Sequence, residues 1–166
     1  MRLELRILFG ESDCFLKHII TLGTCTKIDG AVVEVGKEHF DNAHPQINPI
    51  VMDGRIYLQA TTKKYDLIQI DAYRQPYIPF HLVTEEFFTE VYEHLEDGGV
   101  LVINVASVRG VSQELAAMIF RTIREVFPWA IKIKATRSND VIIATKSPEL
   151  KGKDPSTFKK VTESPR

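Results

Sequence analysis

The chain has 166 residues, enough for one domain with a sizeable core but not for two. Its residues are 44% hydrophobic and 26% charged, and the formal net charge of −1 gives no overall field that attracts nucleic acid or a membrane. No apolar run approaches the roughly 20 residues of a membrane span, and the N-terminus has no secretory pattern. Cys14 and Cys25 form no Cys-x-x-Cys pair, which favours reduced thiols in a cytoplasmic protein.

Strand and helix patterns alternate through the first half of the chain. Gly10 closes the first apolar run, and Ser12 or Asp13 is a suitable cap for a short helix after it. The last strand of this half is nearly all apolar, as in a parallel sheet buried on both faces, and it ends at Asp71. The predicted elements are strand 3–9, helix 12–21, strand 24–28, helix 31–40, strand 47–52, helix 55–60 and strand 65–71.

The second half begins after Pro76, which is incompatible with a helix or a central strand. An aromatic loop, 77–81, leads to Thr84, a favourable N-cap for the next helix. Asp97-Gly98-Gly99 is expected to stop that helix near residue 96. The predicted elements are helix 85–96, strand 100–105, helix 112–127, strand 130–135 and strand 141–145.

This alternation predicts a single α/β domain over residues 1–146 with a mainly parallel sheet. The last two strands are separated by only about five residues, too few for a parallel crossover, so one of them must be antiparallel. From residue 147 onward the chain is rich in proline, lysine and arginine and poor in apolar residues. We therefore expect residues 147–166 to be a disordered tail.

Carboxylates follow three of the predicted strands. Asp53 and Asp71 stand at the ends of strands that we expect to be neighbours in the sheet, and Asp29 lies just beyond the second strand. Ligands of parallel sheets bind outside the carboxyl ends of the strands, so these acids suit a ligand with hydroxyls, amino groups or positive charge. Acids that lie close together also raise one another's pKa, which would make one of them a candidate general base. The alternative is that they only cap the helices that follow.

Several motifs, taken in order from about Thr26 to Thr145, resemble the spermidine synthase-like branch of the class I S-adenosylmethionine-dependent transferases. The combination is more specific than any single motif. The resembling segments are Ile28-Asp29-Gly30-Ala31-Val32-Val33-Glu34, His39-Phe40, Asp53-Gly54-Arg55, residues 65–73, Thr84-Glu85-Glu86-Phe87-Phe88 and residues 95–101.

The resemblance implies a doubly wound, Rossmann-like, mainly parallel sheet of seven strands with an antiparallel C-terminal strand, the class I methyltransferase fold. In that family, an aminopropyl group moves from decarboxylated S-adenosylmethionine to a diamine, and methylthioadenosine is released without help from a metal. The acid matching Asp53 hydrogen-bonds the adenine amino group, and the acid matching Asp71 helps to deprotonate the attacking amine.

The candidate site follows from this resemblance. Asp71 is the expected catalytic base, and Tyr73 and Arg74 are the expected substrate contacts. S-adenosylmethionine or its decarboxylated form is the expected donor, and no metal site is expected. The donor-binding candidates are Gly10, Asp29, Asp53 and Gly54.

Three positions depart from the family pattern. The glycine-rich turn after the first strand keeps only Gly10, and the side chains of Glu11 and Asp13 would crowd it. Lys27 stands where the family has an acid that holds the ribose hydroxyls, and a lysine has no acceptor. Arg74 replaces a second acid, which favours a neutral or anionic acceptor. The small N-terminal β-domain of the polyamine enzymes is also missing from the sequence, so we interpret it as N-terminally truncated.

Three functions stay open at this point: an aminopropyltransferase-like enzyme acting on a small molecule, a methyltransferase on the same scaffold, and a non-catalytic relative that binds a ligand or forms a homodimer. Tyr73, Tyr77 and Phe80 either line an acceptor pocket, pack on the sheet edge or form a dimer contact. His81 is either an acid or base or a packed side chain. Asn104 either contacts a ligand or caps a helix.

Overall fold

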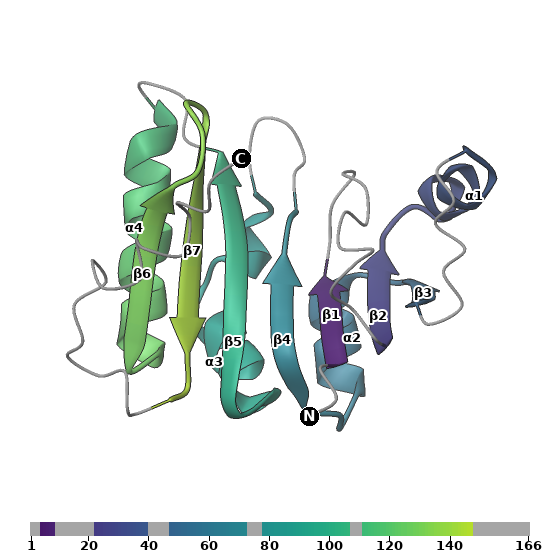
Figure 1. Cartoon of the computed structure of the whole chain (residues 1–166), viewed down its shortest axis with the longest axis horizontal. Helices are drawn as coiled ribbons and strands as arrows, with labels where there is room; N and C mark the ends of the chain where they lie inside the picture. Colours follow the sequence, from purple (N-terminus) through teal and green to yellow (C-terminus); the bar gives the residue numbers. More distant parts are fainter. Residues whose placement is uncertain (1–3, 9–21, 40–46, 73–77, 107–110, 148–166) are drawn as a thin grey trace, which may run out of the picture.

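One sheet organises the described part of the chain. The structure is a computed structural model that describes residues 4–8, 22–39, 47–72, 78–106 and 111–147. Within these residues seven strands pair in the order β3-β2-β1-β4-β5-β7-β6 (Figure 1). The strands are β1 (Glu4–Leu8), β2 (Leu22–Lys27), β3 (Ile47–Val51), β4 (Tyr65–Ile70), β5 (Leu95–Ala106), β6 (Trp129–Lys134) and β7 (Asn139–Thr145).

The strands from β3 to β5 are parallel, and among the described strands β7 alone runs in the opposite direction to the rest of the sheet. β1 pairs in parallel with β2 and β4, β2 with β3, and β4 with β5. β7 lies between β5 and β6 and is antiparallel to both. The short turn before β7 is held by Ala135 N and Thr136 N, which both donate to Asn139 O. The predicted antiparallel strand at the C-terminal end of the domain is therefore present.

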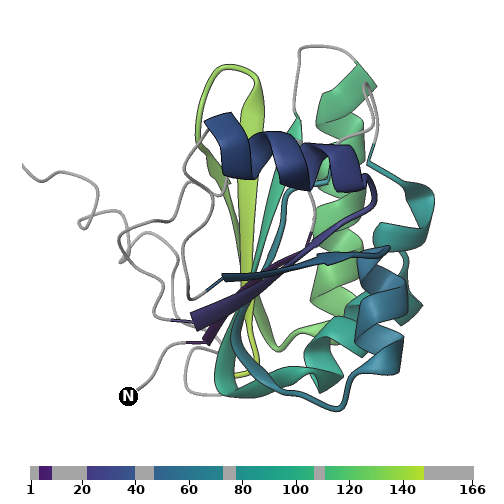
Figure 2. The ribbon, with the colours of Figure 1, turned by 90° about the vertical axis from the view of Figure 1, so that its right-hand side faces the viewer.

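Helices α2, α3 and α4 cover one face of the sheet, and α1 follows the upper end of β2 (Figures 1 and 2) and contacts both β2 and β3. Phe87 and Phe88 of α3 and Ile119 and Ile123 of α4 are buried with the apolar residues of β4 and β5. The helical elements are α1 (Gly30–His39), α2 (Gly54–Ala60), the 3-10 turn η1 (Phe80–Leu82), α3 (Glu85–Glu93) and α4 (Val111–Val126).

The helix predicted over 12–21 and most of the predicted tail, 148–166, lie outside the described residues. No helix in the described ranges is both long and apolar enough to cross a membrane.

The predicted end of α3 is wrong. The helix stops at Glu93, and Leu95 to Gly99, expected as helix end and turn, belong to β5. Tyr65 N donates to His94 O at 2.9 Å, and Leu95 is almost fully buried opposite Tyr65. Pairing with β4 and burial of Leu95 therefore override the local tendency of this segment to continue the helix.

Gly98 and Gly99 are required at the start of β5 for different reasons. Gly98 has a φ of +79°, and space is open around it. A Cβ on Gly99 would lie 2.8 Å from Glu96 O and 3.0 Å from Tyr65 O. Gly99 O also accepts from Thr145 Oγ1 at 3.0 Å, so the backbone has little freedom to move away.

Gly99→Ala is expected to lower the free energy of unfolding by about 2–3 kcal/mol, because the new methyl group overlaps backbone oxygens of two segments. Gly98→Ala is the matched control and should cost only about 1 kcal/mol, the strain of a left-handed backbone. Urea unfolding of the two variants measures the difference. Equal stabilities would show that crowding at Gly99 is not the limiting factor.

Candidate functional site

The carboxyl ends of the parallel strands bring the predicted acids to one edge of the sheet. Asp29, Asp53 and Asp71 follow β2, β3 and β4, and these three strands run in the same direction through β1. Met52 N donates to Lys27 O at 2.8 Å, which joins the ends of β2 and β3 directly. This is the edge at which ligands bind in open parallel sheets.

Asp53 and Asp71 do not follow neighbouring strands, contrary to the prediction. β3 and β4 are consecutive in the sequence, but β2 and β1 lie between them in the sheet. The prediction failed because chain order does not give sheet order: β1 and β4 pair at the centre, and the chain winds outward to β3 before it crosses back. Each carboxylate consequently has its own set of partners.

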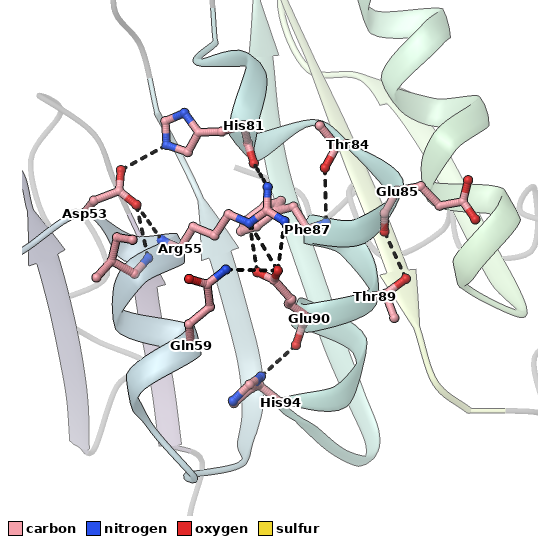
Figure 3. Close-up of polar contacts among 11 residues, drawn as sticks. Asp53, Arg55, Gln59, His81, Thr84, Glu85, Phe87, Thr89, Glu90 and His94 are labelled. Atoms are coloured by element: carbon pink, nitrogen blue, oxygen red, sulfur yellow. Dashed lines mark hydrogen bonds and ion pairs between the residues drawn. The ribbon is translucent and has the colours of Figure 1, made fainter.

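Asp53 is both the N-cap of α2 and the partner of a histidine (Figure 3). Its Oδ1 accepts from Arg55 N at 2.9 Å and from Ile56 N at 3.2 Å. Its Oδ2 lies 3.0 Å from His81 Nε2, which must be the donor if the carboxylate is ionised. The Asp53 side chain is 22% exposed. The capping alternative is therefore correct for Oδ1, while Oδ2 faces away from the helix backbone.

Asp29 also caps a helix. Its Oδ1 accepts from Ala31 N at 2.9 Å at the start of α1, and the side chain is exposed. Lys27 is half-buried at the end of β2. Gly54 is buried as the first residue of α2.

Asp71 is held by the next strand of the sheet. Asn104 Nδ2 donates to Asp71 Oδ1 at 3.1 Å, and the register of β4 and β5 pairs Ile70 with Ile103, one residue before each. The amide of Asn104 thus fixes the orientation of a half-buried carboxylate at the edge of the sheet. The sequence had left the role of Asn104 open between a ligand contact and a helix cap, and this bond is neither.

Arg55 is a residue of this region that the sequence analysis did not single out. Its Nε and Nη2 form a fork on the Glu90 carboxylate, with contacts of 2.9 Å to Oε2 and 2.8 Å to Oε1. Its Nη1 donates to His81 O at 2.9 Å. One guanidinium therefore connects α2, α3 and η1 (Figure 3). No local sequence pattern links Arg55 with Glu90, because the two lie 35 residues apart.

The remaining candidates, Gly10, Tyr73, Arg74 and Tyr77, lie outside the described residues. The structure does describe Phe80, which is exposed and lies one residue before His81. Ile28 and Met52, beside Asp29 and Asp53, are exposed apolar residues as well. The described part of this edge therefore combines carboxylate oxygens with apolar surface.

Comparison with known proteins relates the chain to one family. The sequence pattern of the spermine/spermidine synthase domain matches residues 15–147. A protein of Bifidobacterium longum named probable polyamine aminopropyl transferase is 38% identical over 105 residues, which are 63% of this chain and 23% of that protein. The chain spans less than half the length of the curated polyamine aminopropyltransferases that it matches.

Solved structures share the fold at lower sequence identity. A spermidine synthase in complex with the transition-state analogue AdoDATO superposes with a TM-score of 0.76 at 19% identity, over 99% of this chain and 62% of that one. Human methyltransferase-like protein 13 in complex with SAH superposes with a TM-score of 0.73 at 21% identity, over 95% of this chain and 78% of that one.

The Arg55–Glu90 pair makes stability depend on pH. Partial burial raises the pKa of Glu90, but the hydrogen bonds from Arg55 and Gln59 and the positive charge of Arg55 outweigh it and hold the pKa below its ordinary value. A lowered pKa in the folded state means that this stabilisation is present above the ordinary range of a glutamate and is lost as the pH falls through the lowered pKa.

Glu90→Gln should reduce the free energy of unfolding by about 1 kcal/mol at pH 7, because the substitution removes the negative charge that pairs with Arg55. The difference from the unmodified protein should shrink as the pH falls and Glu90 itself becomes protonated. Glu93→Gln, an exposed glutamate on the same helix, is the control and should leave stability unchanged. Denaturant titrations between pH 3 and 7 test this, and a difference that does not vary with pH would contradict it.

Proposed function

The chain belongs to the spermine/spermidine synthase domain family, and from this premise we propose that it transfers an aminopropyl group from decarboxylated S-adenosylmethionine to an amine acceptor. The observation that carries the proposal is the presence of Asp53 and Asp71 at the same edge of a parallel sheet. The strand order, with β7 antiparallel between β5 and β6, supports a doubly wound, Rossmann-like class I methyltransferase fold beneath this site.

Asp53 is the proposed contact to the nucleobase of the donor. Its Oδ2 is an acceptor suited to the exocyclic amino group of adenine. The exposed side chains of Ile28 and Met52, which are sequence neighbours of Asp29 and Asp53, offer apolar surface for the adenine ring. Gly54, the first residue of α2, is a further proposed donor contact because it directly follows Asp53. Gly10 is the proposed point at which the backbone approaches the donor.

The ribose of the donor needs a hydrogen-bond acceptor, and the side chain of Lys27 offers none. Asp29, two residues further along, is the proposed replacement. One of its oxygens caps α1, and a carboxylate has further acceptor positions for a hydroxyl group.

Asp71 is the proposed general base. It takes a proton from the acceptor ammonium. The neutral nitrogen then attacks the methylene carbon of the aminopropyl group, next to the sulfonium, and forms the new carbon–nitrogen bond. The carbon–sulfur bond breaks, its electron pair goes to sulfur, and methylthioadenosine leaves. The sulfonium already carries the charge that makes it a leaving group, so the protein has to orient the reactants and remove the proton. Asn104 supports this role by orienting Asp71.

Tyr73 and Arg74 are the proposed acceptor contacts, because they follow Asp71 directly in the chain. A guanidinium at residue 74 repels a second positive charge, so the proposed acceptor is an amine whose remaining part is neutral or anionic.

Methyl transfer from S-adenosylmethionine is the second candidate, supported by the shared fold with the SAH-bound methyltransferase-like protein. The two reactions leave different products, methylthioadenosine for aminopropyl transfer and S-adenosylhomocysteine for methyl transfer. A non-catalytic binding or dimerising module yields neither.

Asp71→Asn should abolish release of methylthioadenosine from decarboxylated S-adenosylmethionine and a panel of amines, while the melting temperature stays within a few degrees because a carboxylate at the edge adds little packing. Asp66→Asn is the matched control, since Asp66 lies on the same strand near its opposite end. Product analysis by chromatography tests the proposal. Full turnover by Asp71→Asn would exclude Asp71 as the base, and a large loss of stability would make it a structural residue.

Asp53→Asn should weaken binding of methylthioadenosine about tenfold or more, because a charged hydrogen-bond acceptor is lost. Asparagine caps helices as well as aspartate does, so stability should be retained. Isothermal calorimetry on the full chain measures both affinities. Absence of heat with millimolar ligand for the unmodified protein would overturn the proposed donor site.

A further inference from the structure

The oxygens of Asp53 are both in use before any ligand arrives. Oδ1 accepts two backbone N–H groups of α2, and Oδ2 accepts from His81 Nε2. The capping bonds are part of the helix and cannot be exchanged without fraying its first turn. An amino group that is to bind Asp53 must therefore approach Oδ2, where the histidine already lies.

The backbone of His81 is fixed while its ring is not enclosed. Arg55 Nη1 donates to His81 O at 2.9 Å, and Leu82 N donates to Pro79 O at 2.9 Å. Ile78, two residues before this turn, and Leu82, its last residue, are both buried. The His81 side chain itself is 47% exposed. The ring can therefore leave Asp53 by rotation of the side chain alone, with the turn held in place.

The Asp53–His81 bond is weak enough to be exchanged for a ligand. A hydrogen bond between partly exposed groups contributes only a modest net free energy, because water replaces each partner when the bond breaks. Arg55 also contacts this turn through His81 O, but its charge is paired with the Glu90 carboxylate, so it does not compete with His81 for Oδ2 of Asp53.

We propose that His81 controls access of the nucleobase to Asp53 and so sets the affinity of the site for nucleosides with an exocyclic amino group. This inference rests on the proposed donor site. In the free protein the imidazole N–H is bonded to the oxygen that the amino group requires, and the proposal is that the ring must leave before the amino group can bind. Binding replaces the N–H donor of His81 at Oδ2 by the amino group of the nucleobase. The free energy of the lost histidine bond therefore makes the binding free energy less favourable. A nucleoside without the amino group does not compete for Oδ2 and escapes this penalty.

The test is calorimetry of the full chain with methylthioadenosine and with its analogue that has hydrogen in place of the 6-amino group. His81→Ala should bind methylthioadenosine roughly two- to tenfold more tightly, the range that corresponds to one net hydrogen bond. The same variant should leave affinity for the analogue unchanged. His81→Gln, whose side-chain amide restores an N–H donor, is the matched variant and should return the affinity toward that of the unmodified protein.

The outcomes separate this inference from the proposed function. Unchanged or weaker binding by His81→Ala, with Asp53→Asn still impaired, would overturn the role of His81 and leave the donor site intact. A gain in affinity that is equal for both nucleosides, or that His81→Gln shares, would overturn competition at Oδ2 as its cause. Binding by none of the proteins would overturn the inference together with the donor site. Circular dichroism of each variant establishes that it is folded before the comparison is made.

Discussion

The parallel hydrogen bonding of the central strands is the constraint on which the site depends. β1, only five residues long, pairs with β2 on one side and with β4 on the other, and so joins the two halves of the sheet. Since these strands share one direction, the residues that follow them emerge at one edge. Asp29, Asp53 and Asp71 come from segments far apart in the chain, and only this pairing gives them a common edge.

The side chain of Arg55 connects the packing of α2 against α3 with the turn that carries His81. Arg55 binds Glu90 on α3 through two nitrogens and the carbonyl of His81 through a third, and its guanidinium carbon lies 5.9 Å from the centre of the Phe87 ring. Planar, bidentate contacts of this kind restrict geometry more than a lysine could. The position of His81 beside Asp53 therefore depends on how α2 packs against α3.

Asp53 and Asp71 differ in the hydrogen-bond partners that they have at the carboxyl edge of the sheet. Asp53 serves the fold with one oxygen and has a histidine on the other, so any ligand contact must coexist with helix capping. Asp71 has a side-chain partner, Asn104, that orients it.

Local sequence features determined the order of the strands and α-helices that the structure describes, the antiparallel strand at the end of the domain, the N-cap at Thr84 and the acids after strands, because periodicity, capping and connection length act over a few residues. The tertiary structure decided that α3 ends at Glu93, because Leu95 pairs with Tyr65 across the sheet. It also decided that β2 and β1 separate Asp53 from Asp71, that His81 meets Asp53 and that Arg55 meets Glu90. These contacts join residues 28 or 35 positions apart, and no short-range pattern encodes which distant partners the winding of the chain brings together.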